Sequence, residues 1–284
     1  MLVALHDGQR TEATSAQRND GYTCPNCKGP VVLKRGRIVI AHFAHKPPVS
    51  CDWAAGETLA HLEAKHLFAA LFRGRGRRVE IEYTIPAVPS FRRADVVVWS
   101  RRDHPVVVEL QHTNIGIEEI EMRAFAYAKA GFVQTWIPFL RPDIWDSAQQ
   151  LEDDDRGRSQ YLIKRYAARP FERWIHGFNC GHIMYYDPRL KALWSGSFEG
   201  HLISGGGDTW YDSDGNENYS APYARWSRRW RELALTGPFE LADIFFKPKP
   251  RTAYSVGPHR WPAGGYVETH VRVKRAATTA DSDE

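Results

Sequence analysis

The chain has 284 residues, of which 43% are apolar and 25% are charged, and its formal net charge is +4. This composition excludes an intrinsically disordered chain, and the length suits a globular protein with more than one domain. No apolar run reaches the length of a membrane-spanning helix, and the N-terminus lacks the apolar core of a signal peptide. We therefore expect a cytoplasmic protein without a membrane partner.

The chain divides into three segments that differ in composition and in their predicted secondary structure. Residues 1–55 are rich in turn signals, residues 56–140 alternate between helical and strand-like runs, and residues 141–284 are irregular with many Trp, Tyr, Gly and Pro residues. We predict an N-terminal zinc-ribbon-like domain, an α/β domain and a mixed C-terminal extension of unassigned role. The oligomeric state does not follow from the sequence.

The first segment carries a candidate zinc site. Cys24 and Cys27 form a C-x2-C pair before a glycine, a spacing that lets both thiolates face one tetrahedral ion. We predict a hairpin of strands 31–34 and 37–41, so the second pair of ligands should follow it. His45 and Cys51 are the preferred pair, with His42 as the alternative histidine. The competing interpretation is a set of reduced, unliganded thiols.

The elements of the second segment follow one another without long gaps. We predict a helix at 57–72, an alternating strand within 77–88, strands Val96–Trp99 and Val106–Val108, a helix within 115–132 and a strand within 133–140. Gly131 is placed to end the second helix. The order of helix, three strands, helix and strand indicates an α/β domain.

Two acidic residues interrupt the middle strands of this domain. Asp95 precedes the first apolar run, and Glu109 follows the second. If the two strands pair antiparallel, both carboxylates lie at the same end of the sheet, and Gln111 shares the face of Glu109. Such oxygen ligands suit Mg²⁺ or Mn²⁺, which can activate water for phosphodiester hydrolysis. The alternative is a pair of strand-end acids that face solvent.

This spacing resembles the PD-(D/E)XK nuclease core, with Asp95 as the first acid and Glu109 to Gln111 as the E-x-K element. More closely, the chain resembles the competence protein CoiA family, through "YTCPNCKGPVVLKRGRIVIAHFAHK", "GETLAHLEAKHLF", "RRADVVV", "VVVELQHTNIGIEEIEMRAFAY" and "QTWI". These pieces occur in the order of the family and cover about the first 140 residues. The resemblance implies a zinc-binding N-terminal part, a restriction-endonuclease-like domain and a role in handling DNA.

Several residue roles follow from the resemblance. Gln111 stands where the general nuclease pattern has lysine, so we expect Gln111 and Lys65 to position the attacking water. Asp95, Glu109 and the Leu110 carbonyl would hold the ion. Glu57, His61 and Lys65 fall on one helical stripe, and Glu57 is a candidate third carboxylate, whereas a solvated Glu–Lys stripe is the alternative.

Arginines are clustered in two places. "RGRGRR" at 73–78 supplies Arg73 and Arg75, and "RWSRRWR" at 225–231 supplies Arg228 and Arg229 beside two tryptophans. Arginine near aromatic rings suits phosphates and bases, so these four residues are candidate DNA contacts. An amphipathic helix with a Trp face is the alternative for 225–231. Arg123 is a further candidate, and with Tyr127 it binds phosphate or fixes the second helix on the sheet.

The expected function is metal-dependent cleavage of DNA, in transformation or recombination. DNA is the expected partner, with recombination proteins as candidate protein partners. A non-catalytic DNA-binding adaptor and a restriction or antiviral defence nuclease are the alternatives.

In the C-terminal segment, we expect Cys180 to be a core cysteine of a strand and residues 204–220 to form a polar loop.

Overall fold

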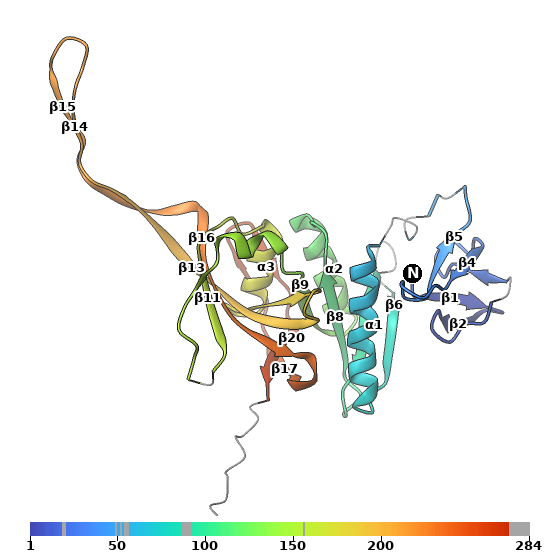
Figure 1. Ribbon diagram of the computed structural model, residues 1–284. Helices are drawn as coiled ribbons and strands as arrows, with labels where there is room; N and C mark the ends of the chain where they lie inside the picture. Colours follow the sequence, from blue (N-terminus) through green and yellow to red (C-terminus); the bar gives the residue numbers. More distant parts are fainter. Residues whose placement is uncertain are drawn as a thin grey trace, which may run out of the picture.

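The computed structural model describes residues 1–18, 21–48, 50–51, 53, 57–86, 92–155 and 157–272. Three parts follow one another across the molecule in Figure 1. Small N-terminal sheets lie on one side, a six-stranded sheet with helix α1 lies in the middle, and a five-stranded sheet lies on the other side. A long hairpin projects from that last sheet into solvent. The predicted tail at 276–284 and the proposed domain boundary at 55–56 lie outside the described residues.

The N-terminal part consists of two small antiparallel units. Strands β1 (Val3–His6), β2 (Gln9–Glu12) and β3 (Tyr22–Thr23) form one sheet, and β4 (Val31–Lys34) pairs with β5 (His42–His45). The hairpin is confirmed, but its second strand was predicted too early, at 37–41. The guanidinium group of Arg35 donates to the carbonyls of residues 13, 14 and 16, and Ile38 is 94% exposed. This anchoring holds the residues after β4 in a loop.

The central sheet has the strand order β17-β20-β9-β8-β7-β6. Its strands are β6 (Val79–Ile85), β7 (Arg92–Trp99), β8 (Pro105–Gln111), β9 (Val133–Pro138), β17 (Ile244–Arg251) and β20 (Gly264–Val271). Strands β6, β7 and β8 are antiparallel neighbours, β8 and β9 are parallel, and β20 joins β9 in parallel. Two strands from the last fifth of the chain therefore complete the sheet that residues 79–138 begin.

Two helices cover opposite faces of this sheet. Helix α1 (Leu59–Gly74) packs Leu62, Phe68 and Phe72 onto one face, and α2 (Ile117–Lys129) packs Ile120, Ala124 and Tyr127 onto the other. Both helices have the apolar stripe that a surface helix needs. Gly131 follows the C-cap of α2 with φ +81°, as the sequence predicts. Within the residues that the structure describes, no helix has the length and apolar character needed to cross a membrane.

The second half of the chain forms the five-stranded sheet and its projection. The strand order is β10-β11-β16-β13-β12. Its elements are η2 (Pro142–Ser147), β10 (Gln149–Gln150), β11 (Ser159–Tyr166), α3 (Pro170–Phe178), β12 (Ile183–Asp187), β13 (Ala192–Gly205) and β16 (Tyr223–Glu240), and η3 (Leu241–Asp243) leads back to β17. A bridge between Phe139 and Tyr186 links this sheet to the central one.

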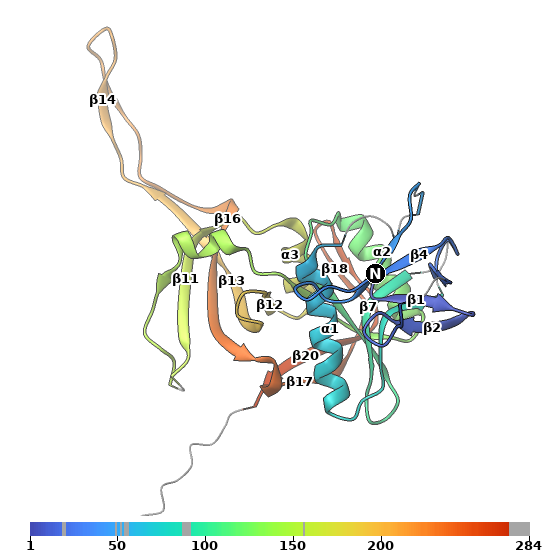
Figure 2. The same ribbon diagram turned by 45° about the vertical axis from the view of Figure 1, so that its right-hand side comes forward.

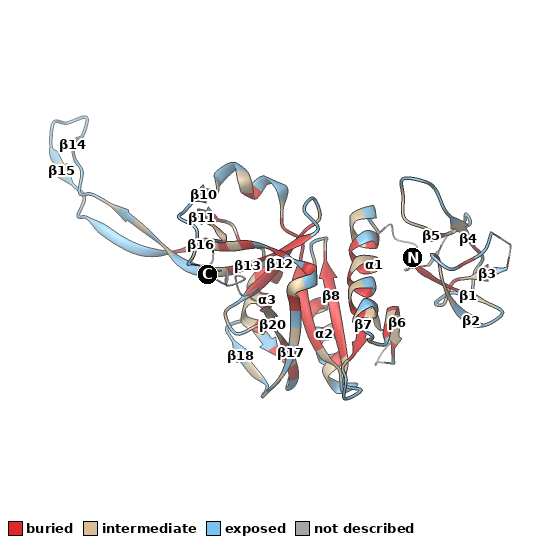
Figure 3. Cartoon of the chain, turned by 60° about the horizontal axis from the view of Figure 1, so that its bottom comes forward, coloured by how far each residue is buried: buried red, intermediate tan, exposed pale blue. Residues whose placement is uncertain are grey.

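The projection is a β-ribbon. Residues 200–226, which we call the arm, comprise the outer parts of β13 and β16 and the hairpin of β14 (Thr209–Tyr211) and β15 (Glu217–Tyr219). Figure 2 shows the arm extending away from the body, and Figure 3 shows that it is largely exposed. The helical alternative for 225–231 is therefore wrong, because these residues lie in β16. The loop predicted at 204–220 contains a hairpin instead.

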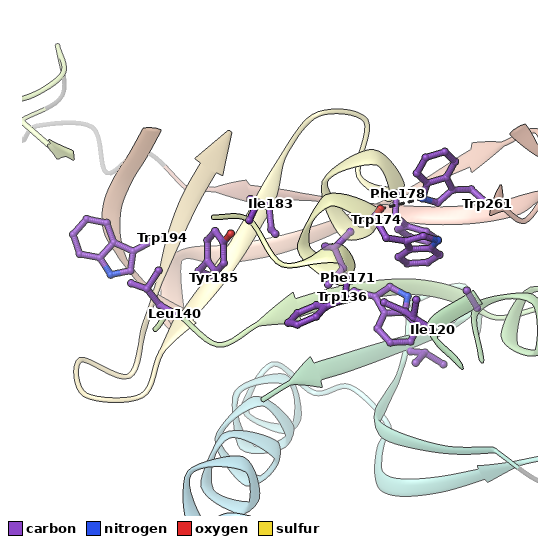
Figure 4. Packing of buried hydrophobic residues seen from close by; sticks show 14 of the residues in the cluster. Ile120, Trp136, Leu140, Phe171, Trp174, Phe178, Ile183, Tyr185, Trp194 and Trp261 are labelled. Atoms are coloured by element: carbon purple, nitrogen blue, oxygen red, sulfur yellow. Dashed lines mark hydrogen bonds between the residues drawn. The ribbon is translucent and has the colours of Figure 1, made fainter. Parts of the chain in front are cut away.

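Helix α3 joins the two large sheets through one aromatic core. The ring of Trp174 lies 5.8 Å from Trp136 of β9 and 6.3 Å from Trp261, which ends β19 (His259–Trp261), the partner of β18 (Tyr254–Val256). Figure 4 shows these rings with Phe171 and Phe178 of α3. Cys180 is exposed in the turn after α3, with φ +55°, so its assignment to a core strand was wrong.

We expect Gly177→Ala to destabilise the protein by roughly 1–3 kcal/mol, the usual cost of overpacking. A Cβ on Gly177 of α3 would lie 2.4 Å from the indole ring of Trp261. Gly74→Ala is the matched control, because a Cβ there meets nothing within 4 Å. The free energy of unfolding from urea titration measures both. Equal stability of the two variants would contradict the tight packing of α3 against Trp261.

Candidate active site and metal centre

Polar groups gather at one end of the central sheet, where α1 and β7 begin and β8 ends. Asp95 lies near the start of β7, and Glu109 and Gln111 lie near the end of β8. Glu57 precedes α1, while His61 and Lys65 lie on the helix. Antiparallel pairing of Val96 with Val108 sets this register, so the two strand ends meet as the sequence predicts.

Asp95 is the centre of this group. Its Oδ2 atom accepts hydrogen bonds from the backbone N–H of Leu110, at 2.9 Å, and from Nε2 of His61, at 3.1 Å. Burial by itself would raise the pKa of Asp95, but His61, Lys65 and Arg123 outweigh it and hold the pKa well below its usual range. Asp95 therefore remains a carboxylate at any physiological pH.

Three side chains here can reach one metal ion. Ligand atoms of Glu57, His61 and Asp95 all lie within 4.8 Å of one another. Two carboxylates and an imidazole form a donor set that divalent ions such as Mn²⁺ accept. Glu109 is not a member of this group.

A buried ion network fixes Glu57. Lys65 is fully buried, and its Nζ atom contacts the Glu57 oxygens at 2.8 and 2.9 Å and Oε1 of Glu82 at 2.6 Å. Arg93 adds a 2.8 Å contact to Glu57. Burial opposes the charge on Lys65, but Glu82 and Glu57 raise its pKa. The amino group is therefore charged and fully occupied by carboxylates.

Glu109 makes its contacts with α2. Its Oε2 accepts from Arg123 at 2.6 Å, and its Oε1 accepts from the hydroxyl of Tyr127 at 2.5 Å. Burial raises the pKa of Glu109 to about 7, which Arg123 partly opposes and Asp95 reinforces. Gln111 is also buried, and its Nε2 donates to the carbonyl of Thr113 at 2.6 Å. Both side chains are thus engaged within the protein in this structure.

The five candidate DNA-binding arginines fall into two classes. Arg73 pairs with Glu12, Arg123 pairs with Glu109, and Arg75 donates to carbonyls of the first two residues of η3 and the first residue of β17. The side chains of these three arginines are therefore engaged in contacts within the protein. Arg228 and Arg229 are exposed, and neither forms an ion pair with any residue that the structure describes. They lie where the register of β16 shifts against β13 between Arg231 and Trp226.

Two charged residues of the site, Glu82 and Arg93, were not predicted from the sequence. Glu82 lies in a strand whose alternation would place it opposite Ile81, on the other face. Its φ of +52° instead turns it toward Lys65, a local conformation that no periodicity predicts. Arg93 lies two residues before Asp95, and its link to Glu57 across 36 positions depends on the packing of α1.

The N-terminal part brings four possible metal ligands together. One ligand atom from each of Cys24, Cys27, His45 and Cys51 lies within 4.8 Å of the other three. Backbone bonds from Cys24 to Gly29 and from Lys28 to Cys24 close the turn that carries the first pair. The pairing of Val31 with His45 returns β5 to this turn. His42 lies outside the cluster, and its Nδ1 contacts the carbonyl of Ile40.

The raised pKa of Glu109 makes stability depend on pH. Between the ordinary glutamate pKa of 4.5 and the raised pKa of about 7, the folded protein binds a proton that the unfolded chain releases, so this group lowers stability as pH rises. We expect the free energy of unfolding of the wild type, relative to Glu109→Gln, to fall by roughly 2 kcal/mol between pH 5 and 8. Chemical denaturation at both pH values measures this. A difference that grows with pH would show that Arg123 and Tyr127 keep Glu109 ionised throughout.

Comparison with known proteins gives two matches to family models. The N-terminal domain of competence protein CoiA matches residues 5–54, and the nuclease-like domain of competence protein CoiA matches residues 57–142. Competence protein CoiA of Bacillus subtilis (strain 168) is 26% identical over 117 residues, which cover 41% of this chain and 31% of that protein. The match thus spans about a third of the relative. No solved structure matches the chain.

The two matched domains follow each other in the same order as the cysteine cluster and the carboxylate site. Residues 5–142 of the chain are therefore similar to the N-terminal domain and the nuclease-like domain of the competence protein CoiA family.

Proposed function

We propose that the protein is a metal-dependent DNA nuclease that hydrolyses phosphodiester bonds. The observation that carries this proposal is the group of Glu57, His61 and the buried Asp95 at the end of the sheet in the nuclease-like domain. Buried carboxylates are seldom retained without a partner or a ligand. The arrangement of α1, three antiparallel strands, α2 and a parallel strand is in keeping with a PD-(D/E)XK core.

The donor atoms fit a divalent ion such as Mg²⁺ or Mn²⁺. When bound, such an ion would polarise the phosphodiester and lower the pKa of a water molecule. Two ligand sets share Asp95: one adds Glu109 and the Leu110 carbonyl, and the other adds Glu57 and His61. In this structure the second set is the more compact, because Glu109 contacts Arg123 and Tyr127.

The surrounding side chains orient the ligands. His61 and the Leu110 N–H fix one oxygen of Asp95, and Lys65 with Arg93 fixes Glu57. Because its amino group is occupied by carboxylates, Lys65 acts on them in this arrangement. Gln111 remains the candidate for orienting the attacking water, without the positive charge that lysine would bring.

The base of the arm supports contact with DNA. Arg228 and Arg229 are exposed there, and Trp226 beside them is 67% exposed. The ring of Trp226 lies over Gly200, where a Cβ would approach it to 2.9 Å. The glycine thus supports a flat, accessible ring between cations, which suits bases and phosphates.

A non-catalytic adaptor in recombination is the second candidate. One observation favours it: the acids of the site are already bonded to cationic side chains, and Gln111 replaces the usual lysine. Such an adaptor would bind DNA through the same surfaces without cleaving it. Cleavage that depends on added metal separates the two candidates.

We further propose a structural zinc ion at the cysteine cluster. Three sulfur atoms and one imidazole nitrogen are a common closed set for tetrahedral zinc, which leaves no open position for catalysis. The small sheets around it bury few large side chains, so a metal would supply much of their stability.

We expect Asp95→Asn to reduce metal-dependent DNA cleavage by roughly a hundredfold or more, because a bound ion supplies several kcal/mol of transition-state stabilisation. Cleavage of single-stranded, duplex and branched DNA is measured with and without Mg²⁺ or Mn²⁺. Asp146→Asn, an exposed acid outside the site, is the control.

Two further variants distinguish the ligand sets. A larger loss in His61→Ala than in Glu109→Gln favours the Glu57–His61–Asp95 set, and the reverse favours Glu109. Full activity of a folded Asp95→Asn variant would overturn the nuclease proposal.

We expect one zinc ion per chain by elemental analysis of the purified protein. Cys27→Ser, Cys51→Ser and His45→Ala should each lower the zinc content and the thermal stability, because each removes one of four ligands. Cys180→Ser and His42→Ala are the controls and should keep the ion. Retention of full zinc content in His45→Ala with loss in His42→Ala would overturn the choice of histidine.

A further inference from the structure

A basic cavity lies at the end of the central sheet opposite to the carboxylate site. It has a volume of about 460 Å³ and is enclosed by the C-terminal end of α1, the turn between β7 and β8, and β17. From His61 to the end of α1 at Gly74 the helix rises by roughly 20 Å. The cavity is therefore separate from the site of proposed cleavage.

The residues that line the cavity carry an excess of positive charge. Its charged or titratable lining residues are Arg75, Arg77, Arg101, Arg102, His104 and Arg272, and no acidic residue lines it within the described chain. Arg77, Arg101 and Arg102 form no ion pair with any described residue. Burial lowers the pKa of Arg75, and the neighbouring Arg272 and Arg77 lower it further, against Asp243. These charges repel one another, so an anion placed between them would stabilise this end of the protein.

Aromatic rings form the other wall. The rings of Phe72 and Phe246 lie 5.1 Å apart, and both residues line the cavity. Val98 and Val106 complete this apolar side. A bare inorganic anion would leave these rings in contact with water. A ligand that joins phosphate to a flat, apolar group would cover both walls.

We propose that this cavity binds a nucleoside phosphate, with its phosphate held by Arg77, Arg101 and Arg272 and its base against the rings of Phe72 and Phe246. The volume lies within the range of small-molecule sites. The same chemistry can come from a free nucleotide or from the 5′-phosphorylated end of a DNA strand. The proposal does not depend on nuclease activity, because none of these residues contacts the carboxylates.

Calorimetric titration of the full chain at low salt tests the proposal. The probes are AMP, ATP, tripolyphosphate and short oligonucleotides with or without a 5′-phosphate. We expect ATP or AMP to bind, and the double variant Arg77→Ala with Arg101→Ala to weaken that binding at least tenfold. Arg165→Ala, an exposed arginine on β11, is the matched control and should bind as the wild type does.

A second variant tests the contribution of the aromatic rings separately from that of the arginines. Phe246→Ala should weaken ATP binding and leave tripolyphosphate binding unchanged, and a urea titration checks that the variant is folded. Tighter binding of the 5′-phosphorylated oligonucleotide than of ATP identifies a strand end as the source, and the reverse identifies a free nucleotide. Both results support the proposal.

Three outcomes would overturn the proposal. They are no saturable binding of any nucleotide, equal affinity for ATP and tripolyphosphate, and unchanged binding in the double arginine variant.

Discussion

The buried amino group of Lys65 is the interaction on which the site depends. It lies between two carboxylates, one before α1 and one on β6, in an interior where a lone charge would be strongly disfavoured. The second carboxylate, Glu82, also accepts from the backbone N–H of Val3 in the N-terminal sheet. One cation therefore sets the position of the helix, the sheet edge and the N-terminal domain relative to one another. The carboxylate end of the sheet is organised by this arrangement before any metal is considered.

A second constraint is that the nuclease-like domain does not end where its sequence motifs end. Strands β20 and β17 add to β9, and the aromatic core around Trp174 spans α2, α3 and β19. Residues beyond 142 therefore bury surface that would otherwise be exposed on the CoiA-like half. The C-terminal half contributes part of the sheet as well as the exposed arm, so the strands that complete the sheet are separate from the arm.

The sequence predicted the features that depend on neighbouring residues along the chain. The C-x2-C turn and the strands around Asp95 and Glu109 follow from spacing and alternation. Both helices were expected, although the first begins and ends two residues later than the predicted 57–72. It could not predict contacts that depend on a single unusual backbone angle or on distant packing. Glu82 reaches Lys65 because of its positive φ, and Arg35 moves β5 by anchoring the loop to residues 13–16. Glu109 lies beside Asp95 in register, but α2 supplies it with closer partners, and no pattern within β8 reveals them.

The arm has a consequence for the solution behaviour of the protein. Beyond the body, β13 and β16 pair only with each other, so both outer edges of the ribbon expose unpaired backbone N–H and C=O groups. Such edges favour pairing with a strand of another molecule. The arginines at the base and the acidic residues around the tip, such as Asp212 and Asp214, oppose that pairing by charge, and the register shift near Ser227 interrupts a flat edge. The arginines that we propose as contacts to DNA would thus also oppose self-association of the ribbon through its edges.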